Sequence, residues 1–159
     1  MNIVTFYNCD PKDAPKTTMP AHLGANALIT CQGKILLERR RDSDTWGLIG
    51  GGCKKWETGR QAIAREVYEE LGLRIPQEKF TKLAVYDNPG RIAAYRDGSI
   101  WRMVIVLYGL ELPEEPVLRL SSESKEARFF TREEARHLQI PVTHADIVRE
   151  WFTAREADC

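Results

Sequence analysis

The feature that most constrains the fold is an amphipathic helix predicted directly after a glycine-rich loop at positions 46–56. Thr58 and Gln61 fit a helix-capping box, and Gly72 stands where helices commonly end. Bulky aliphatic residues recur between them with helical spacing, at Ile63, Val67 and Leu71. A helix over Thr58–Leu71 therefore presents one face to a core.

Three carboxylates share a neighbouring face of this helix. Glu66, Glu69 and Glu70 stand at i, i+3 and i+4, about 100° around the helix axis from the apolar stripe. Like charges this close repel, and burial would raise their pKa values unless a cation compensates. Oxygen ligands suit Mg²⁺ or Mn²⁺. The alternative is a solvated face on which Arg65 and Glu69 form an ordinary ion pair.

Strand patterns lie before and after this helix. Apolar, β-prone runs predict strands at Ile3–Tyr7, Ala25–Thr30, Lys34–Arg39, Lys82–Tyr86, Ile92–Tyr95, Ile100–Leu110 and Ala127–Phe130. A second capping box opens a short helix after Thr131, and Thr143 is predicted to cap a last helix through Ala154. This order predicts an α/β fold, an α/β/α sandwich around a mixed β-sheet. Residues 1–20, with three prolines, are expected to be an N-terminal appendage to a domain over residues 21–159.

The residues from Gly51 to Leu73 fit the pattern G-x5-E-x7-R-E-U-x-E-E-x-G-U, where U is a bulky aliphatic residue, at every specified position. This pattern is the Nudix box, and the chain resembles the Nudix hydrolase superfamily, which includes MutT-type proteins. The likeness extends over about residues 21–152 and includes Ile35–Arg40 and Trp46–Gly51 before the box and Glu123–Leu138 after it. Two positions depart from the usual pattern: Ile49, where proline is frequent, and Trp56, where glycine is common.

The resemblance implies metal-assisted water attack at phosphorus on a nucleoside diphosphate linked to a second moiety. It implies Glu66, Glu69 and Glu70 as carboxylates that face a Mg²⁺ or Mn²⁺ ion, with a backbone carbonyl from Gly51. Arg65 would orient a glutamate. Glu57 would join the metal site or brace the loop. The general base varies in this family, and the candidates are Glu66, Glu70, Glu123 and Glu126.

Substrate contacts are predicted less directly. Tyr86, Tyr95, Trp101 and Arg102 flank the predicted hairpin, where a base could stack and a phosphate could bind, and Arg40 belongs to a short basic run. The alternative for each aromatic residue is packing. Pro89, 16 residues beyond Leu73, resembles the Nudix members that hydrolyse ADP-ribose and similar nucleotide sugars. Asn-Pro-Gly is also an ordinary turn sequence.

Composition excludes several classes. The 159 residues contain 23 Lys and Arg against 23 Asp and Glu, so a dedicated nucleic-acid binder is not expected. Four scattered cysteines indicate free thiols in a reducing cytoplasm. No secretory signal or membrane span is expected. The expected partner is a small nucleotide, and a homodimer is left open.

Three rival functions remain open from the sequence. One is a nucleoside triphosphate pyrophosphohydrolase of the same family. Another is a non-catalytic module that senses a nucleotide, although such modules usually lose box carboxylates. The third is an isomerase of allylic diphosphates, which would want an added Cys or His metal site.

Overall fold

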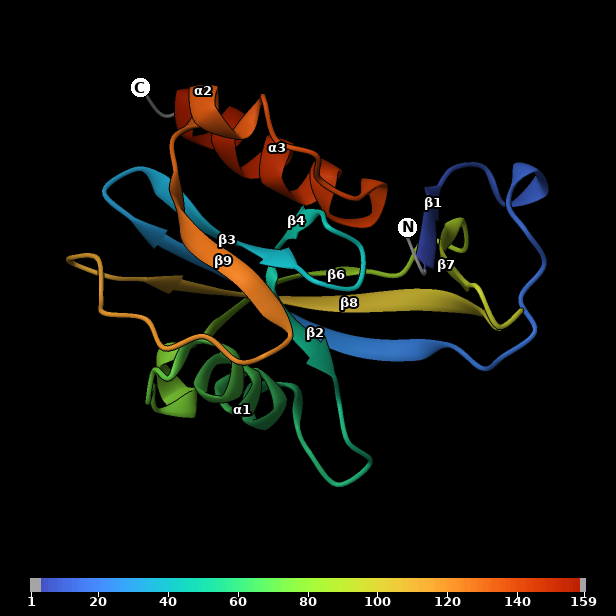
Figure 1. The fold of residues 1–159 in the computed structure, drawn as a ribbon, viewed down its shortest axis with the longest axis horizontal. Coiled ribbons are helices and arrows are strands. Elements are labelled where there is room, and N and C mark those ends of the chain that lie inside the picture. Colours follow the sequence, from blue (N-terminus) through green and yellow to red (C-terminus); the bar gives the residue numbers. More distant parts are fainter. Residues whose placement is uncertain (1–3, 158–159) are drawn as a thin grey trace.

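Within residues 4–157, which the structure describes, nine strands form a mixed sheet between two layers of helices (Figure 1). In this computed structural model, α1 (Gly59–Leu71) covers one face of the sheet. α2 (Arg132–Ala135) and α3 (Val142–Ala157) lie on the opposite face (Figure 1). The predicted α/β/α sandwich around a mixed sheet is therefore confirmed.

The long strands at the centre of the sheet run parallel, and the other pairings are antiparallel. The strands are β1 (Val4–Asn8), β2 (His22–Cys31), β3 (Lys34–Arg40), β4 (Trp46–Gly47), β5 (Ile49–Gly52), β6 (Thr81–Tyr86), β7 (Arg91–Tyr95), β8 (Ile100–Glu111) and β9 (Ser124–Phe130). The order β1-β7-β8-β2-β3-β4 forms the main path; β5 joins β2, β6 joins β8 and β9 joins β3. Short 3-10 turns occupy Pro11–Asp13 and Gln77–Lys79.

The predicted strands are present with shifted ends, and Ile3 of the first one lies outside the described residues. The segment at positions 46–56 was expected to be a loop throughout, which is wrong. It contains β4 and β5, and β5 pairs with β2 from Ala27↔Ile49 to Gly24↔Gly52. Glycines give no alternating side-chain pattern, so a strand built from them is invisible to hydrophobic periodicity.

The expected cap at Thr143 is also wrong. α3 begins at Val142, and the first backbone amides, of His144 and Ala145, donate to the carbonyl of Pro141 at 2.9 Å each. Thr143 therefore lies inside the first turn and is buried. By contrast, the capping boxes of Thr58 with Gln61 and of Thr131 with Glu134 are confirmed.

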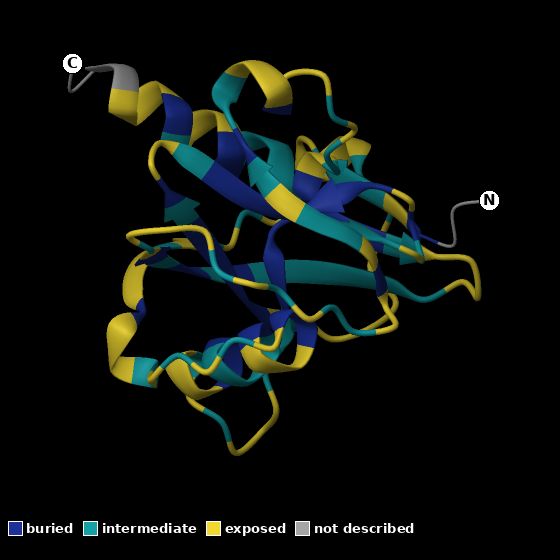
Figure 2. Cartoon of the chain, turned by 60° about the vertical axis from the view of Figure 1, so that its left-hand side comes forward, coloured by how far each residue is buried: buried dark blue, intermediate teal, exposed yellow. Residues whose placement is uncertain are grey.

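The core has one part on each face of the sheet (Figure 2). Successive strand residues point to opposite faces, so Ala27 and Ile29 of β2 pack toward α1 while Leu28 packs toward α3. The apolar stripe of α1 is completely buried at Ile63, Val67 and Leu71. Because β2 is covered on both faces, its sequence is almost continuously apolar.

A buried guanidinium fastens β7 to α3. Arg91 is 1% exposed, and its Nη2 lies 2.6 Å from Oδ2 of Asp146. The same side chain donates to the backbone carbonyl of Thr143 and, at 3.0 Å, to Oδ1 of Asn88. Asn8 of β1 adds bonds to the carbonyl of Val142 and to Asp146. This network fixes the first turn of α3 against β1 and β7.

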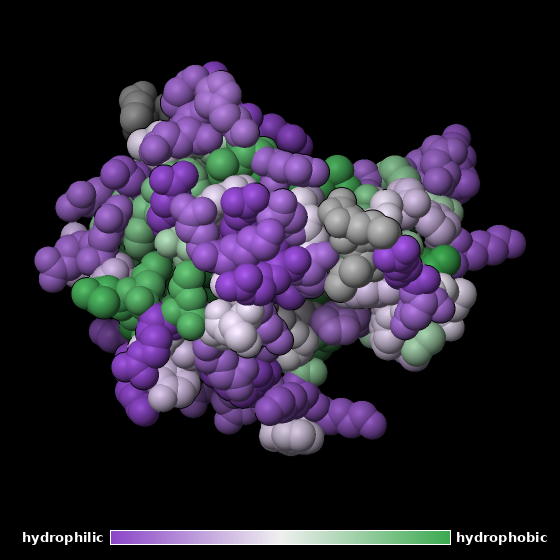
Figure 3. Space-filling model, in the orientation of Figure 1, coloured by the Kyte–Doolittle hydropathy of each residue, from purple (hydrophilic) through white to green (hydrophobic). Residues whose placement is uncertain are grey.

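Figure 3 shows the hydropathy of one face of the molecule. The face turned toward the viewer in Figure 3 is mostly hydrophilic, with apolar side chains visible between charged ones. No helix within the described part of the chain is both long and apolar enough to cross a membrane.

Candidate active site

Arg65 braces the loop between β5 and α1. Its Nε and Nη2 donate to the two oxygens of Glu57 at 2.7 and 2.9 Å, and Nη2 also donates to the carbonyl of Gly52 at 3.0 Å. Nη1 donates to Glu66 at 2.9 Å and to Glu69 at 3.1 Å. These bonds lower the pKa of Glu57 to about 2. Arg65 therefore makes more than the single surface ion pair that the alternative interpretation assumed.

The three helix carboxylates have different surroundings. Glu70 is 4% exposed, and its Oε2 accepts the backbone N–H of Gly50 at 3.1 Å. Glu66 lies against Gly51, where an added Cβ would come within 2.6 Å of the Glu66 Oε1 atom. Only a glycine permits this approach. The Glu69 side chain is half-exposed.

Burial and mutual repulsion act on Glu38, Glu66 and Glu70, which we call the acidic group. Burial raises the pKa of Glu66 and of Glu70, and the nearby charges of Glu38 and Glu66 raise the pKa of Glu70 further, to about 9. Glu38 of β3 is itself buried and accepts a hydrogen bond from Ser124 Oγ at 2.6 Å. Because such carboxylates ionise together only beside a positive charge, the group has the electrostatic character of a cation site.

The donor chemistry fits a hard divalent cation, since the oxygens come from carboxylates and backbone. Among the described residues, however, no three His, Cys, Asp or Glu side chains are grouped closely enough to hold a metal ion as they stand. Glu66 and Glu69 both point an oxygen at Arg65 instead. Small side-chain rotations are therefore part of any cation binding here.

A cleft of about 240 Å³ adjoins the glycine strand. It lies between β5, β2, β8, the first turn of α3 and the N-terminal strand β1. The side chains that line it include Val4, Phe6, His22, Asn26, Arg40, Asp42, Tyr95, Met103, Ile105 and His144. His144 is partly buried, and its Nδ1 accepts the N–H of Leu48 at 3.1 Å. None of the three helix carboxylates lines the cleft itself, but Glu70 and Glu66 contact Gly50 and Gly51, which do line it.

Arg40 and Tyr95 are the predicted substrate contacts that line this cleft, and Arg40 supplies its positive charge. The Arg40 Nε and Nη2 atoms each donate a hydrogen bond of 3.1 Å to Asp42, and its Nη1 donates to Glu38 at 3.4 Å. Its side chain is partly exposed, so the guanidinium is held in place and still reachable from the cleft.

The remaining predicted contacts, Tyr86, Trp101 and Arg102, do not line the cleft. Trp101 lines a second hollow that adjoins the cleft. Tyr86 donates to Glu150 of α3 at 2.8 Å and does not line the cleft, although the sequence had placed it at the cleft edge. Arg102 donates to the backbone carbonyl of Asp87 and does not line the cleft either.

The two later base candidates have different surroundings. Glu123 lies in the turn before β9, and its charge contributes to raising the pKa values of Glu38 and Glu66. Glu126, on β9, pairs with Arg128 at 3.2 Å. Glu123 is thus the one whose charge acts on the buried acidic group.

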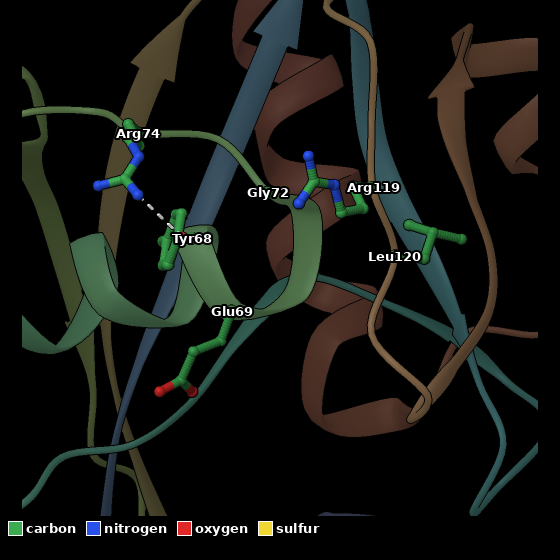
Figure 4. Close-up of a pocket in the computed structure, with 6 residues that line it drawn as sticks. All are labelled: Tyr68, Glu69, Gly72, Arg74, Arg119 and Leu120. Atoms are coloured by element: carbon green, nitrogen blue, oxygen red, sulfur yellow. Dashed lines mark hydrogen bonds between the residues drawn. The ribbon is translucent and has the colours of Figure 1, made fainter.

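A separate polar hollow lies at the end of α1 (Figure 4). Tyr68, Glu69 and Arg119 help to line it, and Arg74 stacks on the Tyr68 ring and donates to its hydroxyl at 3.1 Å. Figure 4 shows the Glu69 side chain extending away from Arg119. This hollow holds only one of the three helix carboxylates.

Sequence reasoning missed several residues of this region: Glu38, Asp42, His22, Asn26 and His144. One signal was available for Glu38, because an acidic residue directly after the apolar run Ile35–Leu37 is unusual in a strand covered on both faces. The three histidines show no metal-binding spacing, and only the folded chain brings His22 and His144 to one cleft.

Comparison with known proteins shows the family to which this fold belongs. A sequence model of the NUDIX domain matches residues 20–151. The chain therefore belongs to the Nudix family. Nudix hydrolases act on pyrophosphate bonds and depend on a divalent metal.

Three similar proteins illustrate the relationship. A MutT-like protein of Streptomyces ambofaciens is 30% identical over 81% of this chain and 75% of its own length. An ADP-ribose pyrophosphatase of Methanocaldococcus jannaschii is 32% identical over 75% of this chain and 68% of its own length. The solved MutT/nudix family protein of Enterococcus faecalis has a TM-score of 0.59 and 27% identity over 74% of this chain, which spans 46% of that protein.

Proposed function

We propose that the protein cleaves the internal pyrophosphate of a nucleoside diphosphate sugar such as ADP-ribose, giving a nucleoside monophosphate and a sugar phosphate. The observation that carries this proposal is the burial of Glu66 and Glu70 beside the Gly50–Gly52 strand, at the edge of a cleft. Phosphoryl chemistry asks mainly for positioning and charge compensation, which this arrangement supports.

The proposed cofactor is Mg²⁺ or Mn²⁺. Glu66, Glu69 and Glu70, with the carbonyl of Gly51, would hold it. When bound, such an ion neutralises phosphate oxygens and lowers the pKa of the attacking water. Glu57 is assigned to bracing, since Arg65 and the N–H of Lys54 already occupy its two oxygens.

The chain's own groups then have distinct roles. A carboxylate accepts the proton of the attacking water, and the candidates are Glu66, Glu70, Glu123 and Glu126. Among the later two, Glu123 is favoured because its charge acts on the buried acidic group. Arg40, held by Asp42, is proposed to donate hydrogen bonds to the substrate from inside the cleft.

Two observations support a nucleotide sugar as the substrate. One relative is named an ADP-ribose pyrophosphatase, and Pro89 has the spacing seen in such enzymes. The second support is weaker, because the turn at Asn88–Gly90 also serves packing. An added Cβ on Gly90 would overlap the carbonyl of Cys9, so the turn fits closely against the N-terminal segment.

The test is steady-state kcat/KM over a panel of ADP-ribose, UDP- and GDP-sugars, NADH, dinucleoside polyphosphates and common and oxidised triphosphates, with Mg²⁺ and with Mn²⁺. A nucleotide sugar is expected to be preferred. A triphosphate preferred by more than about tenfold, roughly 1.4 kcal/mol, would overturn the substrate class while leaving the family standing. Nucleotide binding with no hydrolysis anywhere in the panel would instead support the sensing module.

The variant that tests the role of the helix carboxylates is Glu69→Gln, which removes a half-exposed charge without opening the core. It is expected to lower kcat by on the order of 100-fold with an unchanged Tm, as loss of a main electrostatic contribution does. Equal wild-type rates in EDTA and in Mg²⁺ would contradict the metal-assisted reaction.

A further inference from the structure

Away from the acidic group, the cleft continues into a hollow with aromatic walls. His22, Tyr95 and Met103 line both spaces, so the two are continuous. The imidazole of His22 lies against Gly52, where an added Cβ would come 3.0 Å from Nε2. Its other side meets the ring of Trp101 edge to face, with centroids 6.1 Å apart. Along this path the lining changes from the glycines of β5 to the rings of His22, Tyr95 and Trp101.

The N-terminal strand supplies part of the cleft wall. Val4 and Phe6 of β1 line the cleft, and both precede the region 20–151 that matches the family. β1 pairs with β7 in antiparallel register, with Val4 opposite Tyr95. The segment expected to be an appendage thus stands beside the aromatic hollow and carries an aromatic ring of its own.

His22 has unused hydrogen-bonding capacity at the junction of the two spaces. Its Nδ1 is buried and has no hydrogen-bond partner among the described residues. Burial lowers the pKa of His22, which favours the neutral ring. A neutral imidazole has one donor and one acceptor nitrogen, so it can recognise either kind of ligand atom.

We propose that these residues form a nucleobase subsite, with Phe6, Tyr95 and Trp101 as its walls and His22 as its hydrogen-bonding residue. Bases stack on aromatic side chains because every base has a π-face. The subsite rests on the proposed function in that the substrate is a nucleotide. It places the base at the aromatic end and the diphosphate at Gly50–Gly52.

The direct test compares two kinds of ligand that share a sugar and a phosphate and differ in whether they carry a base. Binding of the four nucleoside monophosphates and of ribose 5-phosphate is measured by calorimetry with Mg²⁺ present. Wild type should bind at least one nucleoside monophosphate more tightly than ribose 5-phosphate. Trp101→Ala and Phe6→Ala should reduce that preference by about tenfold or more, since stacking contributes most of it.

Matched controls come from rings outside the subsite. Trp56 is 79% exposed, so Trp56→Ala removes an indole that lines neither space. Tyr7 is the neighbour of Phe6 on β1, and its side chain points to the other face of the strand. Trp56→Ala and Tyr7→Ala should keep the wild-type preference. His22→Gln, which retains a donor and an acceptor, should keep more of it than His22→Ala.

Kinetics separates this proposal from a structural role. The Trp101 and Phe6 variants should raise KM for the best panel substrate and leave kcat within about threefold, because the groups act on binding rather than on the acidic centre. Equal wild-type affinity for ribose 5-phosphate and all four monophosphates would overturn the subsite, even with nucleotide sugars hydrolysed. Conversely, a preference lost in Trp101→Ala supports the subsite even if no nucleotide sugar is hydrolysed.

Discussion

The Nε atom of Arg65 lies 2.7 Å from Oε2 of Glu57, across the turn that joins β5 to α1. Since the same guanidinium also binds the carbonyl of Gly52 and two helix carboxylates, one side chain sets the distance between loop and helix. The helix carboxylates are therefore positioned from the strand as well as from their own backbone.

Arg65→Lys keeps the charge but loses the planar fork that makes these bonds simultaneously. We expect apparent Mg²⁺ affinity or kcat/KM to fall by about 10- to 100-fold, as for other residues that orient metal ligands, with little change in Tm. Activity measured over a Mg²⁺ titration checks this. A fully active variant that is only slightly less stable would reduce Arg65 to an ordinary surface ion pair.

Gly51→Ala should displace Glu66, because the new methyl would lie 2.6 Å from Oε1 and 2.8 Å from the carboxyl carbon. A flexible side chain can move, so the fold should survive and the loss should fall on kcat, by about tenfold or more. Circular dichroism and kcat measured on the same preparation separate the two effects. Wild-type kcat would show that Glu66 does not need its place against the strand.

The metal-free protein should lose stability as pH rises. Burial, then repulsion from Glu38 and Glu66, raises the pKa of Glu70 from 4.5 to about 9. The folded state thus binds this proton more tightly, so its contribution is complete below pH 4.5 and is lost as pH rises toward 9. Urea unfolding in EDTA at pH 6, 7.5 and 9 should show the decline, and Glu70→Gln should flatten it. An equally steep decline in the variant would assign it to other groups.

His144 should make the fold sensitive to acid in the opposite sense. Burial lowers its pKa from 6.5 to about 4, so the folded state disfavours the protonated ring. Its contribution is complete above pH 6.5 and is lost as pH falls toward 4. His144→Gln keeps an acceptor for the Leu48 N–H and cannot be protonated there. The variant's Tm should fall less than that of wild type between pH 7 and 4.5 in differential scanning fluorimetry.

Local sequence signals predicted α1 well. The Thr58–Gln61 capping box and the apolar stripe of α1 act within about four residues of each other, and such short-range effects are readable from the chain. The position of Glu66 and Glu70 relative to the glycines of the Nudix pattern was also predictable, because the pattern fixes their spacing along the chain, but the strand that these glycines form was not. The difference in exposure between Glu69 and Glu70 could not be predicted from the sequence.

The cleft was harder to predict because it depends on distant segments. Glu38 is buried because β9 pairs with its strand and Glu70 of α1 lies nearby. Phe6 lines the cleft only because β1 pairs with β7. Tyr86 and Tyr95 are both β-strand tyrosines near one hairpin, yet Tyr86 donates to α3 while Tyr95 lines the cleft. Tertiary packing decides between them, and no local pattern records it.

The Arg91 network ties β7, β1 and the first turn of α3 into one unit that is bonded to itself more than to α1. Cooperative units of this kind open together in native-state hydrogen exchange. The amides of β1 and β7 should therefore exchange with a common opening free energy, lower than that of α1. Such an opening would remove one wall of the cleft while α1 stays folded, and under the proposed function it would give product a way out that leaves Glu66, Glu69 and Glu70 in place.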